Sequence, residues 1–312
     1  MGCDAARDLT LQAADGVAVR AMVWPGGRGP VVVVAPATSV RARYYVRFAQ
    51  YLQGQGCTVI TFDYRGIGAS RPPSLRRFDA SWFEWGAQDL EAVLRHGAEA
   101  FPERDLMAVG HSIGGVLLGL APSATALQRV FTVGAQYAHW RDYAAGHRLR
   151  MLARWHVLMP AVTALWGYFP GRALGIMEDT PRGVVRDWAR SHARLERASC
   201  RHLGADALQQ RYDGVRAQLL ALSIADDPFG TVPAIERALA YFRQAQVRHL
   251  RLDPAAQGGD AIGHFAYFHS RYEQALWPLG AQWLLHGTLA TIPGLVEIPR
   301  HARDRADEPQ SP

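Results

Sequence analysis

The sequence contains no lysine, so arginine supplies every positive side chain apart from histidine. A Walker phosphate-binding loop, a Schiff-base enzyme and a Ser-Lys dyad each need an ammonium group that a guanidinium cannot replace. These three kinds of chemistry are therefore excluded. The arginines give a formal net charge of +6 but are scattered, and only residues 71–77 and 141–154 approach the clustered basic face of a nucleic-acid-binding protein. We interpret both stretches as solvated and expect no nucleic-acid partner.

Cysteines and long apolar runs are also few. Cys3, Cys57 and Cys200 lie far apart without CxxC spacing, so neither a disulfide framework nor a zinc site is predicted. No apolar leader follows the N-terminus, and the longest uncharged run, residues 157–171, is shorter than the roughly 20 residues of a membrane-spanning helix. We therefore expect a cytoplasmic protein without a membrane span, a metal or a cofactor, and we leave its oligomeric state open.

Short apolar runs alternate with helix-length segments through most of the chain. Residues 9–13 and 17–24 flank Asp15-Gly16 with alternating apolar and polar side chains, which is typical of a β-hairpin. Further strands, apolar and rich in β-branched residues, are expected at residues 31–35, 58–62, 106–109, 129–133, 218–224 and 247–252. Apolar side chains at helical spacing mark the segments between them, at residues 44–53, 82–96 and 112–120. This alternation favours right-handed crossovers and predicts an α/β fold with a doubly wound, mostly parallel sheet.

One long stretch interrupts this alternation. About 80 residues rich in Trp, Tyr and Arg separate the strand ending near Val133 from the strand beginning near Gln218, far more than an ordinary connection needs. We divide the chain into a core of residues 1–136 and 214–290, a helical cap insertion of residues 137–213, and a C-terminal tail of residues 291–312 that we expect to be disordered. Within the core, a closing helix is expected at residues 265–285.

The motif Gly-His-Ser-Ile-Gly at residues 110–114 follows one predicted strand and precedes a predicted helix. A serine at such a sharp turn adopts strained backbone angles, and only small residues two positions away let the chain pass its neighbours. The motif therefore predicts Ser112 as a nucleophile. A glycine-rich turn without chemical importance is the alternative, and partners for the serine further along the chain argue against it.

A serine hydroxyl needs a base to take its proton and a carboxylate to orient that base. In sheets of this kind the acid follows a later strand and the histidine follows the last strand. His264 alone of the 12 histidines lies in the glycine-rich loop after the last predicted strand. Asp226 and Asp227 directly follow the strand before it, and either could be the acid; the Pro228 that follows favours Asp227.

Negative charge on a reacting carbonyl oxygen needs two backbone N–H donors. Ile113, directly after the serine, is the first candidate, because the adjacent helix start points its positive end there. The second donor should come from the loop after the strand at residues 31–35, where we choose Thr38 and keep Ala37 as an alternative. His111, His269 and His286 are interpreted as structural residues.

Residues 63–68, Asp-Tyr-Arg-Gly-Ile-Gly, partly match a dinucleotide-binding fingerprint. The third glycine is missing because position 71 is Arg, and no acidic residue is placed convincingly about twenty residues further on. We therefore do not predict a nucleotide cofactor.

Taken together, several of these segments resemble a bacterial branch of the α/β-hydrolase superfamily whose members are filed as predicted hydrolases or serine aminopeptidase-like proteins. The resemblance extends from about Leu9 to Leu285 and rests on residues 37–38, 44–45, 61–68, 110–114, 226–227 and 262–265. It implies the α/β-hydrolase fold and a triad of Ser112, His264 and either Asp226 or Asp227. The name aminopeptidase is a filing label and implies no peptide substrate.

The leading hypothesis is hydrolysis of a carboxylic ester or related acyl compound through an acyl-serine intermediate. Acyl transfer by the same triad and a non-catalytic ligand-binding protein on this scaffold are the alternatives. Aromatic side chains of the predicted cap, in particular Trp140, Trp155 and Trp166, are expected to line the substrate site. The expected partner is thus a small molecule with an apolar group.

Overall fold

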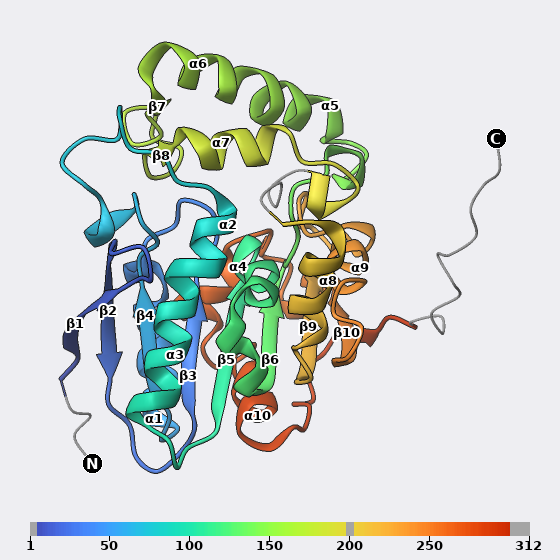
Figure 1. Cartoon of the computed structure of the whole chain (residues 1–312). Helices are drawn as coiled ribbons and strands as arrows, with labels where there is room; N and C mark the ends of the chain where they lie inside the picture. Colours follow the sequence, from blue (N-terminus) through green and yellow to red (C-terminus); the bar gives the residue numbers. More distant parts are fainter. Residues whose placement is uncertain (1–4, 198–202, 300–312) are drawn as a thin grey trace.

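The computed structural model describes residues 5–197 and 203–299, and its centre is a nine-stranded sheet (Figure 1). The strands lie in the order β1-β2-β4-β3-β5-β6-β9-β10-β11. Their bounds are β1 (Arg7–Gln12), β2 (Ala18–Trp24), β3 (Val31–Ala35), β4 (Thr58–Phe62), β5 (Leu106–His111), β6 (Leu127–Val133), β9 (Gln218–Ile224), β10 (Gln246–Leu252) and β11 (Leu295–Glu297). The pairs β1·β2, β2·β4 and β10·β11 are antiparallel and the others are parallel.

Helices cover both faces of the sheet, because its central strands are apolar on both sides. Val31 and Val33 belong to one buried cluster, whereas Val32 and Val34 belong to the other. The second cluster includes side chains of α1 (Val46–Gly54) and α10 (Trp277–His286). The first includes side chains of α2 (Trp82–Glu84), α3 (Glu91–Ala100), α4 (Ile113–Leu117), α8 (Ala205–Asp213) and α9 (Val232–Leu239). The prediction of a doubly wound, mostly parallel α/β sheet is confirmed.

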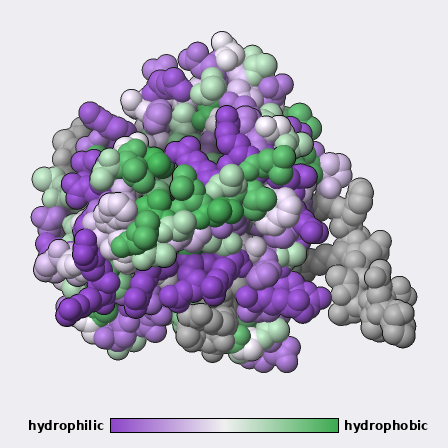
Figure 2. All heavy atoms as spheres, turned by 90° about the horizontal axis from the view of Figure 1, so that it is seen from above, coloured by the Kyte–Doolittle hydropathy of each residue, from purple (hydrophilic) through white to green (hydrophobic). Residues whose placement is uncertain are grey.

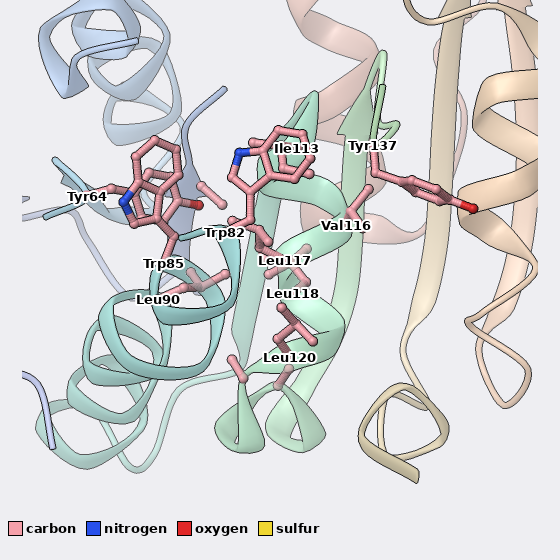
Figure 3. Packing of buried hydrophobic residues seen from close by; sticks show 14 of the residues in the cluster. Tyr64, Trp82, Trp85, Leu90, Ile113, Val116, Leu117, Leu118, Leu120 and Tyr137 are labelled. Atoms are coloured by element: carbon pink, nitrogen blue, oxygen red, sulfur yellow. The ribbon is translucent and has the colours of Figure 1, made fainter. Parts of the chain in front are cut away.

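The short helix α4 is buried along its whole length, which explains why all its residues are apolar or glycine. Figure 3 shows the side chains that pack between α4 and the helices on its flank. Trp85, in the π-helix Trp85–Leu90 that joins α2 to α3, stacks on Tyr64 with ring centroids 4.7 Å apart. This packing fixes the position at which α4 begins, directly after Ser112.

A second layer of helices lies above the carboxyl ends of the parallel strands (Figure 1). It consists of α5 (Arg148–Met151), the π-helix η7 (Leu152–Leu158), α6 (Met159–Trp166), the paired strands β7 (Tyr168–Phe169) and β8 (Thr180–Pro181), and α7 (Arg182–Ala189). We call residues 148–189 the helical layer. Helix α8, inside the expected cap boundary, packs instead on the core, where the Tyr212 hydroxyl donates to the carbonyl of Val116 over 2.9 Å. In the described part of the chain, no helix is long and apolar enough to cross a membrane.

Two expectations for the C-terminal part need correction. The closing helix begins only at Trp277, because Pro278 suits the first turn of a helix and disfavours a helical conformation before it. Residues 291–299 were expected to be disordered, yet β11 lies within them and pairs with β10, where Arg248 and Glu297 form an ion pair of 2.7 Å. The rest of the expected tail, residues 300–312, lies outside the described residues.

Candidate active site

Ser112 occupies the sharp turn between β5 and α4. Its backbone has φ 55° and ψ −126°, a conformation that side chains rarely adopt, and its N–H donates to the carbonyl of Val133 over 2.9 Å. A Cβ on Gly110 would lie 2.3 Å from the Cα of Gly115, and a Cβ on Gly114 would lie 2.2 Å from the carbonyl oxygen of Ala35. The two glycines are therefore required for this turn, which holds the serine at the sheet edge.

Three side chains from separate loops meet at this turn. Nε2 of His264 lies 2.8 Å from Oγ of Ser112, and Nδ1 of His264 lies 2.7 Å from Oδ2 of Asp227. A carboxylate can only accept, so Nδ1 carries the proton and Nε2 accepts from the serine hydroxyl. All three residues are buried, with exposed fractions of 6% for Ser112, 7% for His264 and 3% for Asp227. The arrangement can remove a proton from Ser112 and retain it on the imidazole.

Asp227 is held in its ionised form. Burial opposes its charge, but the electrostatic interaction and hydrogen bond with His264 and two backbone N–H donors outweigh burial and lower its pKa. Those donors are Phe229 and Gly230, whose N–H groups lie 2.8 and 2.9 Å from Oδ1. The carboxylate thus has three fixed partners and cannot readily turn away from the imidazole.

Asp226 faces a different set of partners. Its two oxygens accept from the backbone N–H groups of Ile262 and Gly263 over 2.9 and 2.8 Å. These residues directly precede His264, so Asp226 fastens the loop that carries the histidine. The structure therefore brings Asp227, and not Asp226, against the imidazole, in line with the preference drawn from the sequence.

A second histidine, His111, is hydrogen-bonded to the backbone of His264. From the sequence it was interpreted as a structural residue. Nε2 of His111 donates to the backbone carbonyl of His264 over 2.8 Å, and its Nδ1 lies 2.8 Å from the hydroxyl of Tyr45. The same hydroxyl accepts from the N–H of Ala37 over 2.9 Å. Burial, and then the charge of His264, lowers the pKa of His111 to about 3, so His111 stays neutral. The chain of bonds links the loop at Ala37 to the backbone of His264.

This chain of bonds also bears on the two N–H donors expected for a carbonyl oxygen. The N–H of Ala37 is occupied by Tyr45, whereas we find no acceptor for the N–H of Thr38 within the described residues. Ile113 is the first residue of α4, where an N–H has no acceptor inside the helix. Thr38 and Ile113 both line the cavity that contains Ser112. Of the two candidates in this loop, Thr38 therefore has the free donor.

The loop carrying Thr38 is also tied to the helical layer. Oγ of Ser39 lies 2.6 Å from Oγ1 of Thr180, and the N–H of Glu178 donates to the carbonyl of Ser39 over 3.2 Å. Arg41 forms an ion pair of 2.6 Å with Glu178. These bonds fix the end of the β7–β8 connection beside the site.

A cavity of about 870 Å³ opens above Ser112, between the sheet edge and the helical layer. Its walls are strongly aromatic, formed by Trp82, Trp155, Trp188, Phe229, Phe265 and Phe268. Trp155 and Trp188 stack with their ring centroids 5.1 Å apart, and the ring of Phe229 lies 5.0 Å from that of His264. An apolar group could therefore lie beside Ser112.

Of the three tryptophans expected to line a substrate site, the structure brings only Trp155 to this cavity. Trp140 lies before α5 and lines a separate hollow with His139 and Arg190. Trp166 is the last residue of α6 and is 48% exposed, and it is not among the residues that line this cavity. Trp82 and Phe229, which line the cavity, were missed, since their side-chain directions depend on how distant segments pack.

In the partial dinucleotide motif at residues 63–68, the carboxylate of Asp63 lies against Gly68, the second glycine of the motif. A Cβ on Gly68 would lie 2.2 Å from Oδ2 of Asp63, whose carboxylate accepts from the N–H groups of Ala42 and Ala69 over 2.7 and 2.8 Å. Arg65 forms a buried ion pair of 2.7 Å with Asp89. Within residues 5–197 and 203–299, no group of three His, Cys, Asp or Glu side chains could hold a metal ion.

Comparison with solved structures shows which fold this is. An esterase of Pyrococcus furiosus is 12% identical, with 86% of this chain and 87% of that one covered at a TM-score of 0.54. A thermophilic esterase from Thermogutta terrifontis is 14% identical, with 88% and 99% covered at 0.56. A serine hydrolase without a lid from Xanthomonas campestris is 17% identical, with 94% and 99% covered at 0.51. The chain has the α/β-hydrolase fold.

Sequence comparison agrees with the fold. The family model described as serine aminopeptidase, S33, matches residues 28–166. Two uncharacterized proteins of Mycobacterium tuberculosis are 31% identical over 149 residues, which is 44% of this chain and 51% of theirs. The chain thus spans about half the length of the curated relatives it matches. The chain is thus similar to this family over residues 28–166, and it has the α/β-hydrolase fold that the motifs in its sequence predicted.

Proposed function

We propose that this chain is a serine hydrolase that cleaves a carboxylic ester, or a related acyl compound, through an acyl intermediate on Ser112. The observation that carries the proposal is the unbroken series of hydrogen bonds from Ser112 through His264 to Asp227, at the floor of an open cavity. The match of residues 28–166 to the serine aminopeptidase family model and the esterases among the similar structures support the same class of reaction.

The reaction follows from this geometry. Oγ of Ser112 attacks the acyl carbon while Nε2 of His264 takes the hydroxyl proton, and Asp227 stabilises the imidazolium that forms. The carbonyl oxygen becomes an oxyanion and accepts from the N–H groups of Ile113 and Thr38. When the tetrahedral intermediate collapses, the proton on Nε2 passes to the leaving alcohol. A water molecule then repeats the sequence on the acyl-serine, which releases the acid and restores the serine.

The walls of the cavity indicate an apolar acyl or aromatic group in the substrate. Trp155 and Phe229 offer ring faces on the side of the helical layer and beside the imidazole. Each methylene that such a surface buries contributes roughly 0.8 kcal/mol, so two or three fitting carbons should change affinity by about tenfold or more. Medium-chain esters should therefore be better substrates than acetates.

Covalent labelling tests the proposal directly. A fluorophosphonate probe reacts only with an activated serine, so the native chain should be labelled and Ser112→Ala should not. The exposed Ser74 provides a matched control, because Ser74→Ala leaves the site intact and should label like the native chain. Hydrolysis of p-nitrophenyl butanoate should follow the labelling. An unlabelled native chain, or full labelling of Ser112→Ala, would reject the proposal.

A further inference from the structure

The outward face of the helical layer is apolar. Along α5, η7 and α6, buried residues recur every four positions, at Met151, Trp155, Met159 and Thr163. Two positions away from these, on the opposite side of the helix, the exposed residues are Leu149, Ala153, Val157, Ala161 and Leu165. We call these five residues the outer stripe. Leu149, Val157 and Leu165 are 77%, 62% and 80% exposed. The helix is therefore apolar on both its buried and its exposed side, which is unusual for a surface helix.

Other exposed apolar residues widen this surface. Leu158 and Trp166 flank the outer stripe and are 59% and 48% exposed, and Leu174 in the following loop is 50% exposed. Figure 2 looks down on this side of the molecule and shows hydrophobic residues gathered in a band across it, with hydrophilic residues on both borders. Ile176 is 38% exposed and also lines the cavity that contains Ser112. Apolar side chains of the helical layer thus extend from solvent into the cavity.

The charges beside the outer stripe are all positive. From Tyr143 to Met177 the sequence contains no Asp or Glu, but it contains the four arginines Arg148, Arg150, Arg154 and Arg172. Arg148 and Arg150 border Leu149 on either side. Their guanidinium groups contact the carbonyl of Tyr143 and the ring of His147, and neither forms an ion pair with an acidic residue in the described part of the chain. The surface therefore combines exposed apolar side chains with unneutralised cations.

The exposed apolar side chains and the arginines together favour one kind of binding partner for the outer stripe. A second copy docked on the same stripe would bring two sets of arginines together without an acidic residue to neutralise them. An anionic lipid surface satisfies both features, since its headgroups attract arginine and its acyl chains accept Leu, Val and Trp side chains. Helices that lie in the plane of a bilayer have this pattern of apolar and basic residues.

We propose that the outer stripe docks onto the surface of an anionic lipid bilayer. Leu149, Val157 and Leu165 enter the boundary between headgroups and acyl chains, while Arg148 and Arg150 bind the headgroup phosphates. The docking goes beyond ester hydrolysis and does not depend on it. Because Ile176 connects this surface with the cavity, a docked molecule would hold the entrance to Ser112 close to the lipid phase.

Sedimentation with lipid vesicles tests the docking. The full chain should sediment with vesicles made of equal parts phosphatidylcholine and phosphatidylglycerol, and much less with phosphatidylcholine alone. The double variant Val157→Glu/Leu165→Glu should bind the mixed vesicles at least about tenfold more weakly, because two charges would enter the apolar boundary. The control is Val296→Glu, which places the same charge at an equally exposed valine (61%) on β11 and should bind normally.

A second pair of variants tests the role of charge. Arg148→Gln/Arg150→Gln should remove most of the preference for phosphatidylglycerol, whereas Arg251→Gln, an exposed arginine on β10, should not. Every variant should hydrolyse soluble p-nitrophenyl butanoate like the native chain, which shows that it is folded, and Ser112→Ala should still bind vesicles. Vesicle binding and ester hydrolysis are therefore measured separately, so one proposal can be rejected without the other.

Three results would overturn the proposal: no sedimentation of the native chain with either vesicle, equal loss of binding in Val296→Glu, or a native dimer that Val157→Glu/Leu165→Glu converts to a monomer. The last result would show that a second copy covers the stripe.

Discussion

The sheet edge and the helical layer use their side chains in opposite ways. At the sheet edge, polar groups are buried and each has a fixed partner, as Ser112, His264 and Asp227 illustrate. In the helical layer, apolar side chains such as Val157 and Leu165 are 62% and 80% exposed. Removing the partner of a buried polar group lowers the protein's free energy of unfolding strongly. Replacing an exposed apolar side chain lowers it little.

The sheet edge and the helical layer should therefore tolerate different substitutions. Substitutions at the sheet edge should alter rates or stability strongly, because they leave buried groups without partners. Substitutions in the helical layer should mainly alter which molecules bind. Variants in both regions can test this difference.

The largest effect is expected at Ser112 and His264, the proposed nucleophile and base. Ser112→Ala and His264→Ala should each lower kcat for an ester by several orders of magnitude, on the order of 10⁶ at most, because both act in one proton-transfer step. The double variant should be no worse than either single variant. Steady-state hydrolysis checks this, and a double variant much slower than both singles would contradict the shared step.

The two neighbouring aspartates should differ sharply. Asp227→Asn should lower kcat by about 10³–10⁴-fold, because an amide no longer fixes the imidazole in the required tautomer. Asp226→Asn is its matched control, since it keeps one acceptor for the loop at Ile262 and Gly263 and should lower kcat by less than about tenfold. Kinetic measurement of both variants decides the assignment, and the reverse order would move the acid to Asp226.

His111 should make stability depend on pH. The pKa of His111 is lowered to about 3, chiefly by burial, so the unfolded chain binds a proton that the folded chain does not. The contribution of neutral His111 to the free energy of unfolding is therefore complete above the ordinary histidine pKa of about 6.5. As the pH falls from there toward 3, this contribution is lost at about 1.4 kcal/mol per pH unit. His111→Gln keeps a donor and an acceptor but removes this titration. Urea unfolding at several pH values gives the free energy of unfolding as a function of pH, and this free energy should fall less steeply with falling pH in the variant. An equal pH dependence in both proteins would contradict the prediction.

The smallest effect is expected in the helical layer. Ile176→Ala should lower the preference for octanoate over acetate esters by about fivefold, because Ile176 is a partly exposed wall of the cavity and its loss is worth about 1 kcal/mol. Leu174→Ala, two residues away and outside the cavity lining, is the control and should leave the preference unchanged. The ratio of kcat/KM values for the two esters measures the effect. An equal change in both variants would show that the loop, not the side chain, sets the preference.

Much of the sheet could be predicted because its strands are locally encoded. The apolar runs of β3, β4 and β9 begin and end at the predicted residues, since turn-forming and polar residues bound them. Strand β11 could not be predicted, because three mostly exposed residues become a strand only where the edge of β10 offers unpaired backbone groups.

The amino-acid sequence alone was enough to predict the candidate site residues Ser112, Asp227 and His264. Ser112 lies in a motif whose glycines are required by the turn, and the chain order of Ser112, Asp227 and His264 matches the order in the α/β-hydrolases that the sequence resembles. These are features of short segments, so they can be read without knowledge of distant contacts.

Only the tertiary structure decided the contacts between distant segments. The choice of Asp227 over Asp226 depends on which carboxylate faces an imidazole 37 residues later in the chain. The link from Ala37 through Tyr45 to His111 depends on the short 3-10 helix Ala42–Tyr45 lying close to the end of β5, which carries His111. Trp155 and Trp166 are equally plausible substrate-contacting residues from the sequence, yet Trp155 is buried and lines the cavity, whereas Trp166 at the end of α6 is 48% exposed and does not. Packing between layers, which no local pattern encodes, sets these directions.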